Sequence, residues 1–447
     1  MEKNKMGYMP IPKLILTMSL PAIFSMMTQA LYNIVDSIFV AQIGEAAITA
    51  LSLAFPVQLV IVACFVGMGV GINSLISRSL GAKNYEQAAL AAEHGFFIAI
   101  ILYGWIAVIG IFVMPSFVRL FTDDPMIIQY TIQYLEIIMI FAFGRILAQA
   151  GISILQGSGE MVIPMFSQLI GAVGNIILDP IMIFGLFGFP ALGVRGAAIA
   201  TVTAQIMSMI FVFLMVFKFK KVVKFNPLSF RVNQEILKKI LVVGLPAAIM
   251  QAVASVMLTG LNLILAGFTT TAVAVLGIYY KLQSFIFMPI FGLSQGMMPI
   301  IGFNYGAKSK ERLLKALKMG LVMAVIYMTL GLVVFQIFPK QLILWFNGTD
   351  EMLEIGIKAF KIISLGYPLA AISIVLSTGF QGMGEAHLSM MVSIFRQIIL
   401  LLPIAWLLGT FGSLDVIWFA FIVSEIGGII MVLFFFKRLY QRKIEKL

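Results

Sequence analysis

The chain has 447 residues, of which 61% are hydrophobic and 11% are charged, and its mean hydropathy is +1.06. Because an ordinary globular domain is about 45–50% apolar and about 25% charged, this composition excludes a disordered chain and a coiled coil and disfavours a soluble globule. An excess of 30 Lys and Arg over 19 Asp and Glu gives a net charge of +11. We therefore expect a polytopic membrane protein without a large soluble domain.

Apolar windows bounded by charged residues and by Gly/Pro clusters predict twelve transmembrane helices. They cover residues 13–41, 46–76, 88–114, 126–149, 161–187, 194–217, 237–266, 272–301, 313–338, 352–378, 388–408 and 415–436. A spanning β-barrel would need alternating segments of about ten residues, which these long runs do not resemble. The predicted fold class is therefore all-α.

The basic residues between these helices fall mainly on one side of the membrane. With the N-terminus in the cytoplasm, the inner loops and termini hold 22 Lys and Arg, and the outer loops hold three. The positive-inside rule then predicts a multi-pass protein of the cell membrane with both termini in the cytoplasm. The basic loops would face anionic lipids of the inner leaflet, which explains the net charge without a nucleic-acid partner.

The two halves of the chain match at a constant spacing of 225 residues. The match joins Leu20-Pro21-Ala22 to Leu245-Pro246-Ala247, Gly67 and Gly71 to Gly292 and Gly296, Gly81-Ala82-Lys83 to Gly306-Ala307-Lys308, and Gln156-Gly157-Ser158-Gly159-Glu160 to Gln381-Gly382-Met383-Gly384-Glu385. Six helices in each half give two parallel repeats around a central cleft. The predicted domains are an N-terminal lobe over 1–217, a cytoplasmic linker over 218–236 and a C-terminal lobe over 237–447. The paired glycines favour close helix packing over a flexible point near a cavity.

Ionisable residues in the bilayer core are costly, so each of them requires a reason. Polar stripes contain Gln29, Tyr32, Asn33 and Asp36 on the first span, and Gln168, Gly171, Asn175 and Asp179 on the fifth. Both Asp residues lie past the midpoint of their spans, on the outer side, where two ionised carboxylates would repel each other. Such a pair suits a proton carrier. The alternative is that each Asp caps a helix break or pairs with a fixed base.

The remaining polar residues of the spans are less informative. The seventh span carries the uncharged residues Gln251, Ser255 and Asn262, so the ionic chemistry is predicted to lie in the N-terminal lobe. Glu136 on the fourth span would line a cavity or form an ion pair. Lys281 and Glu425 are a candidate charge pair between the eighth and twelfth spans.

The sequence contains no nucleotide-binding or catalytic motif. The run Gly306-Ala307-Lys308-Ser309 has Ala where a phosphate-binding loop requires its second Gly. His94 and His387 lie near helix ends and form no metal-ligand pattern. We expect no cofactor, no enzymatic activity and no direct use of ATP.

Several of these motifs resemble the multidrug and toxic compound extrusion (MATE) transporters. The resemblance is carried by Leu20-Pro21, by the run Tyr32-Asn33-Ile34-Val35-Asp36-Ser37-Ile38-Phe39-Val40, by Gly81-Ala82-Lys83, by Gln156-Gly157-x-Gly159, by Asn175-Ile176-Ile177-Leu178-Asp179-Pro180 and by Arg396-Gln397. It spans essentially the whole chain and is greatest to the bacterial branch with acids in the N-terminal lobe, the DNA-damage-inducible and staphylococcal exporter type. It implies export of cationic amphiphilic drugs in exchange for H⁺ or Na⁺.

The resemblance also implies roles for particular residues. In that branch the coupling site comprises an Asp of span 1, an Asn and an Asp of span 5 and a Tyr of span 4, which match Asp36, Asn175, Asp179 and Tyr134; the first three would hold Na⁺ if that is the coupling ion. Substrate contacts are expected from Gln29, Tyr32, Asn33, Gln168, Gln251 and Asn262. Family members have been argued to bend span 1 at its proline, which is Pro21 here. The other branch uses acids of spans 7 and 10, which this chain lacks.

The leading hypothesis is a secondary antiporter for organic cations that works by alternating access, as a monomer among membrane lipids. The alternative is a flippase for a lipid-linked sugar or another lipid precursor, which shares the superfamily architecture. A flippase would need cationic residues in its cleft to hold pyrophosphate, whereas the cleft expected here carries acids and amides. A channel is less consistent with two duplicated lobes.

Overall fold

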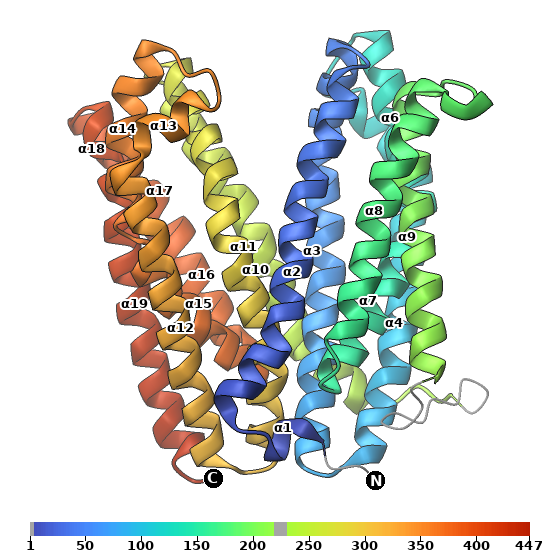
Figure 1. Cartoon of the computed structure of the whole chain (residues 1–447), viewed down its shortest axis with the longest axis vertical. Helices are drawn as coiled ribbons and strands as arrows, with labels where there is room; N and C mark the ends of the chain where they lie inside the picture. The colour runs from blue at the N-terminus through green and yellow to red at the C-terminus, as the bar shows by residue number, and fades with distance from the viewer. Residues whose placement is uncertain (1–3, 219–229) are drawn as a thin grey trace. The chain divides into compact units, whose positions relative to one another are not determined.

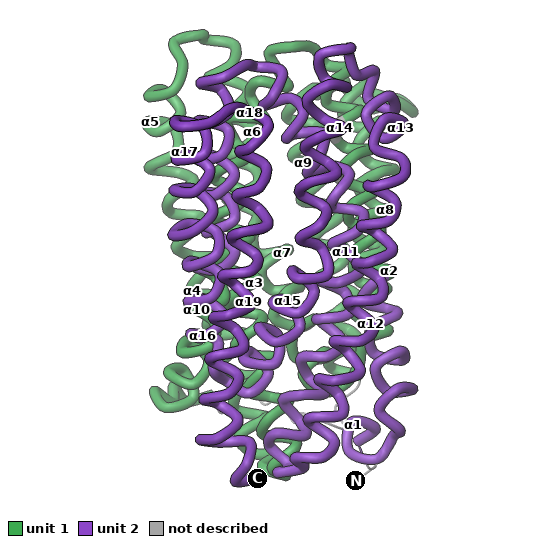
Figure 2. The backbone as a smooth tube through the Cα atoms, turned by 90° about the vertical axis from the view of Figure 1, so that its left-hand side faces the viewer, with its two compact units in different colours: residues 1–3, 24–248 green, residues 4–23, 249–447 purple. Residues whose placement is uncertain are grey.

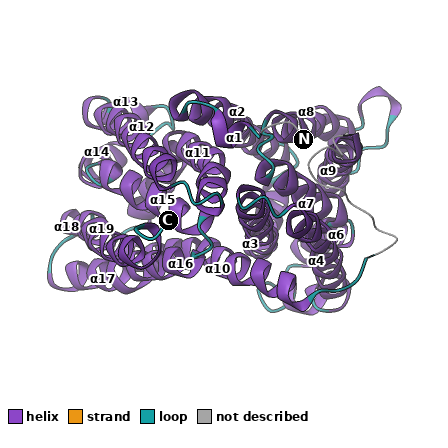
Figure 3. Cartoon of the chain, turned by 90° about the horizontal axis from the view of Figure 1, so that it is seen from below, coloured by secondary structure: helices purple, strands orange, loops and turns teal. Residues whose placement is uncertain are grey.

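The computed structural model describes residues 4–218 and 230–447, apart from the side chains of Asn33 and Ser37. Every regular element within these residues is a helix (Figure 3), which confirms the all-α fold class. Ten of the described helices are long and apolar enough to cross a membrane, and two bent helix pairs raise that number to twelve. Residues 219–229, most of the predicted linker, lie outside the described part of the chain.

The described chain forms two compact units. Unit 1 contains residues 24–248, and unit 2 contains residues 4–23 together with 249–447 (Figure 2). Two long helices, α2 (Ile11–Ala41) and α10 (Gln234–Ala266), therefore each contribute to both units. Their exchange points, after residues 23 and 248, are separated by the 225 residues of the sequence repeat. The predicted lobes 1–217 and 237–447 follow the chain rather than these contacts, and they stay a prediction.

Unit 1 contains the predicted spans 2 to 6 and a part of span 1 (Figure 1). Its other elements are α3 (Glu45–Gly81), α4 (Tyr85–Phe112), α5 (Met114–Val118), α6 (Pro125–Ile140), α7 (Phe143–Gly157), α8 (Val162–Phe184), η1 (Leu186–Gly188) and α9 (Gly193–Lys218). The start of α6 follows from its sequence, because the Asp124 side chain caps the backbone N–H groups of Met126 and Ile127 and Pro125 occupies a position where no N–H is required.

Unit 2 contains the predicted spans 8 to 12 and a part of span 7 (Figure 1). Its other elements are α1 (Lys5–Tyr8), α11 (Thr270–Gly306), α12 (Lys310–Ile337), α13 (Pro339–Leu344), α14 (Asp350–Ser364), α15 (Tyr367–Gly382), α16 (Ala386–Ile394), η3 (Phe395–Leu401), α17 (Leu402–Phe411), α18 (Leu414–Ile417), α19 (Phe419–Leu439) and η4 (Tyr440–Ile444). The segment η3 is a π-helical insertion within the eleventh span.

The fourth and tenth spans, predicted as continuous helices, are each bent. The angle between α6 and α7 is 43°, and the angle between α14 and α15 is 47°. In the second pair the break precedes Tyr367 and Pro368, and a proline cannot continue the hydrogen-bond ladder of the preceding helix. The breaks occur at equivalent places in the repeat, so the bend is a property of the repeated fold.

The repeated glycines pack helices closely, as favoured from the sequence. A Cβ atom added at Gly67 of α3 would lie 2.5 Å from the carbonyl oxygen of Gly244 in α10, within unit 1. A Cβ atom added at Gly292 of α11 would lie 2.5 Å from the Cα atom of Ile23 in α2, within unit 2. Backbones approach this closely only where one residue has no side chain.

The other repeated motifs end helices in matching turns. Lys83 and Lys308 have φ angles of 58° and 55°, and Gly159 and Gly384 have φ angles of 91° and 88°. The Gly306-Ala307-Lys308 run is therefore the turn between α11 and α12. This confirms that it is not a phosphate-binding loop after a strand.

Candidate functional site

The structure brings Asp36 and Asp179 together in unit 1. Asp36 lies on α2 and Asp179 on α8, and their carboxyl groups are hydrogen bonded to each other. Asp179 has no exposed surface, and Asp36 is partly buried. Since an ionised carboxylate has no donor, two carboxyl groups share a hydrogen bond only when one of them holds a proton. The pair is therefore a site that binds one proton between two acids.

Asn175 orients Asp179 from one turn earlier on α8. With its amide turned so that both ends are satisfied, Asn175 donates to Asp179 Oδ2 at 2.6 Å and accepts from the backbone N–H and the hydroxyl of Thr201 at 3.2 and 3.0 Å. Thr201 belongs to α9, which packs extensively on α8 in unit 1. A buried chain of hydrogen bonds thus connects Asp179 to a neighbouring helix.

Tyr134 lies on α6 and is buried beside the acids. Its hydroxyl accepts a 2.8 Å hydrogen bond from Gln58 Nε2 of α3. Tyr134 interacts electrostatically with both Asp36 and Asp179. The four residues that the family resemblance assigned to coupling therefore gather in one part of unit 1.

A cation lies close to this group. Arg145, near the start of α7, places its guanidinium carbon 5.0 Å from the centre of the Phe65 ring on α3. Tyr32 of α2 interacts electrostatically with Arg145 and with the acids. The polar group of unit 1 thus combines two acids with one arginine.

The predicted substrate residues are divided between the two units. Gln29, Tyr32 and Gln168 belong to unit 1, where the side-chain oxygen of Gln168 is buried without a hydrogen-bond partner in the described part. Gln251 and Asn262 belong to unit 2, as does the predicted hinge Pro21, which lies inside the continuous helix α2. The side chain of Asn33 lies outside the described residues.

The suggested charge pair between Lys281 and Glu425 is wrong. Glu425 of α19 binds Arg396 of η3, whose Nη1 lies 2.8 Å from Oε1 and 2.9 Å from Oε2. The Nζ atom of Lys281 lies instead 6.0 Å from the centre of the Phe346 ring. In the described residues Glu136 forms no ion pair.

The described residues hold no group of three His, Cys, Asp or Glu side chains that could bind a metal ion. The histidines have other surroundings. Within unit 1, His94 Nε2 accepts a 2.7 Å hydrogen bond from the backbone N–H of Asn233, and His94 Nδ1 lies 2.8 Å from the carbonyl oxygen of Leu90. His94 therefore connects α4 to the start of α10.

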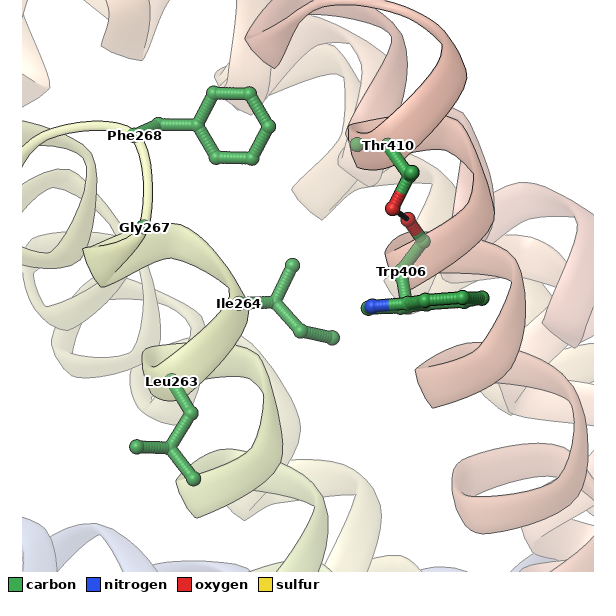
Figure 4. Close-up of a pocket in the computed structure, with 7 residues that line it drawn as sticks. Leu263, Ile264, Gly267, Phe268, Trp406 and Thr410 are labelled. Carbon is green, nitrogen blue, oxygen red and sulfur yellow. Dashed lines mark hydrogen bonds between the residues drawn. The ribbon is translucent and has the colours of Figure 1, made fainter.

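One apolar pocket lies in unit 2, between the end of α10 and α17 (Figure 4). It has a volume of about 280 Å³ and is lined by Leu263, Ile264, Gly267, Phe268, Trp406, Gly409 and Thr410. The Thr410 hydroxyl donates to the Trp406 carbonyl oxygen at 2.8 Å, so its polar group is already satisfied. None of the predicted site residues lines this pocket.

Comparison with known proteins decides the family. The model of the MatE family matches residues 21–181 and 246–407. The chain belongs to the MATE family. The two matched segments begin 225 residues apart, which confirms the internal repeat, and this MATE member is a multi-pass membrane transporter.

Its relatives match over nearly their full lengths. The chain is 28% identical to a protein named FAD transporter from Shewanella oneidensis, covering 89% of this chain and 88% of that one. It is 26% identical to the multidrug export protein MepA of Staphylococcus saprophyticus, covering 93% and 91%. A solved MATE structure, in complex with MaL6, superposes with a TM-score of 0.93 at 26% identity and covers the whole of both chains.

Three residues of the polar group were not predicted from the sequence. Gln58 and Thr201 are single polar residues in apolar helices and belong to no polar stripe. Arg145 carried a usable signal, because a charge inside a span calls for an explanation. Only the packing of α3, α7 and α9 shows that all three face the acids.

Proposed function

We propose that this MATE member is a secondary exporter of organic compounds, and that Asp36 and Asp179 are its coupling site for H⁺ or Na⁺. The hydrogen bond between the two carboxyl groups is the observation that carries the proposal. The MepA name supports drug-like substrates, and the FAD transporter name extends the substrates to an organic compound of a different kind. Neither name favours a flippase.

The proposed mechanism is competition for one charge site. In a dry interior, two ionised carboxylates are costly to bury and repel each other. A proton, a sodium ion or the cationic group of a substrate each relieves that cost, so one ligand displaces another. For Na⁺, the two carboxylates and the Asn175 amide are oxygen ligands. If the site opens alternately to each side of the membrane, this competition is sufficient for antiport.

Two further parts of the proposal concern the membrane. The distribution of basic residues supports both termini in the cytoplasm and an orientation in which substrate leaves the cell. We propose a monomer, since the residues of the coupling group all come from one unit of one chain. Cationic amphiphiles remain the substrate class that two acids favour.

The test is ethidium uptake into everted membrane vesicles, with pH and Na⁺ gradients imposed separately. Uptake should follow one of the two gradients, collapse when that gradient is dissipated, and proceed without ATP. Asp36→Asn and Asp179→Asn should each reduce uptake at least tenfold at matched expression, because each keeps the shape and removes the charge.

The matched control is Asp415→Asn. It makes the same chemical change at an acid that is half-exposed and pairs with Lys358 on unit 2, so its uptake should stay close to that of the unaltered protein. Near-normal uptake by both Asp36→Asn and Asp179→Asn would remove the coupling role. Uptake that requires ATP and no gradient would remove the antiport.

A further inference from the structure

Arg145 has a fixed position and uncommitted hydrogen-bond donors. It lies in the first turn of α7, just after the bend from α6, and its guanidinium group stacks on the face of the buried Phe65. Stacking uses the face of a guanidinium group and leaves the N–H groups along its edge. The ring therefore holds the cation in place without satisfying its donors.

No acid neutralises Arg145 in the described residues. It forms no ion pair and no hydrogen bond there, and Tyr32 is its one titratable neighbour. In unit 2, by contrast, Arg396 binds Glu425, and Arg312 donates to the carbonyl oxygens of Met6 and Met9. A partly buried guanidinium group inside a membrane helix without a partner is costly, and such a residue characteristically faces a polar cavity or a ligand.

The acids of the coupling site are near Arg145 but do not pair with it. Tyr32 interacts electrostatically with Arg145 on one side and with Asp36 and Asp179 on the other. Tyr32 and Asp36 lie one turn apart on the same face of α2. The acids are hydrogen bonded to each other, so the negative and positive groups of this region are held as separate binding points.

We propose that Arg145 binds an oxyanion of the transported substrate, a carboxylate or a phosphate, while Asp36 and Asp179 receive its cationic group or exchange ions. The inference rests on the proposed function and adds a substrate class, amphiphiles that carry an oxyanion, with zwitterions as the best fit. An arginine edge suits this role because it donates two parallel hydrogen bonds to a carboxylate or phosphate. Arg145 is then a specificity residue of the unit 1 site.

The test uses pairs of probes that differ only in the oxyanion. Norfloxacin and its methyl ester differ in a carboxylate, and flavin mononucleotide and riboflavin differ in a phosphate. Binding of each probe to the purified full-length protein is measured with Arg145, with Arg145→Gln and with Arg145→Lys. We expect Arg145→Gln to weaken binding of norfloxacin, flavin mononucleotide or both at least tenfold, and Arg145→Lys to retain an intermediate affinity.

The ester, riboflavin and ethidium are the controls. Their binding should change less than threefold in Arg145→Gln, and ethidium binding should stay equal or become tighter because a positive charge is removed. A loss with norfloxacin identifies carboxylates as the ligand, and a loss with flavin mononucleotide identifies phosphates. Equal losses within both probe pairs, or no loss with either oxyanion, would overturn the inference. Absence of gradient-driven ethidium uptake by the unaltered protein would contradict only the proposed function.

Discussion

Asp179 accepts a 2.6 Å hydrogen bond from the amide of Asn175, one turn earlier on α8. The other end of that amide is held by Thr201 of α9, so the carboxyl group is oriented by a residue that itself has a fixed partner. The arrangement turns one carboxyl oxygen of Asp179 toward Asn175 and keeps the group within reach of Asp36. Asn175 is therefore a positioning residue for the acid pair.

This geometry predicts that Asn175→Ala reduces coupled efflux. A hydrogen bond to a charged group contributes about 1.5–3 kcal/mol, so the affinity of the coupling ion should fall by about tenfold or more. The measurement is ethidium uptake into everted vesicles as a function of the driving ion's concentration. Thr201→Val should give a smaller shift in the same direction, and Thr201→Ser, which keeps the hydroxyl, should give none. An unchanged ion dependence in Asn175→Ala would contradict the positioning role.

In unit 2, the pair of Arg396 and Glu425 is expected to act on stability. Their side chains are 19% and 18% exposed, so removing one partner leaves the other largely desolvated. Glu425→Gln should cost about 2 kcal/mol and lower the apparent Tm of the purified protein by about 4–8 °C. The double variant Arg396→Gln with Glu425→Gln should lose less than the sum of the single variants. Additive losses would show that the two side chains do not interact.

The close approach of α3 and α10 predicts a different response from two glycines. Gly67→Ala would place a Cβ atom 2.5 Å from the Gly244 oxygen and 2.6 Å from the Ala248 Cβ atom, and this overpacking should cost about 1–3 kcal/mol. Gly104→Ala meets nothing within 4 Å, so it should be neutral or slightly stabilising in a helix. Thermal unfolding of both variants tests the packing, and equal melting curves would contradict it.

The proposed orientation predicts opposite labelling at two exposed positions. The chain has one cysteine, so single-cysteine variants are made in a Cys64→Ala background. Glu86→Cys, at the start of α4, should react with a membrane-impermeant maleimide only in everted vesicles. Phe187→Cys, at a position where the side chain is 88% exposed, should react in intact cells after the outer barrier is permeabilised. The reverse pattern would invert the topology.

The sequence predicted the elements with strong local signals. Long apolar runs gave the helices, and the polar stripes through Asp36 and Asp179 indicated the two acids that the packing then brought together. The bends between α6 and α7 and between α14 and α15 were missed, because hydropathy averages over a break of two residues. The partner of Glu425 was misassigned, because a sequence contains no distance between helices that are far apart in the chain.

The exchange of helix segments between the units has the same explanation. Hydropathy and charge divide the chain at the basic segment around 218–236, whereas packing divides it within α2 and α10. Only the close contacts of Gly67 with α10 and of Gly292 with α2 show which unit each half-helix belongs to. Their repetition at the same spacing is the feature through which the sequence signal could have been interpreted.

The most direct test of the central claim is the number of protons released when ethidium binds to the purified protein in weakly buffered solution. If a cationic substrate displaces the proton that Asp36 and Asp179 share, binding should release about one proton, and ethidium affinity should rise with pH where that release occurs. Asp36→Asn should bind ethidium more weakly and release none. Ethidium binding without proton release, or an equal release from Asp36→Asn, would contradict competition at the acid pair.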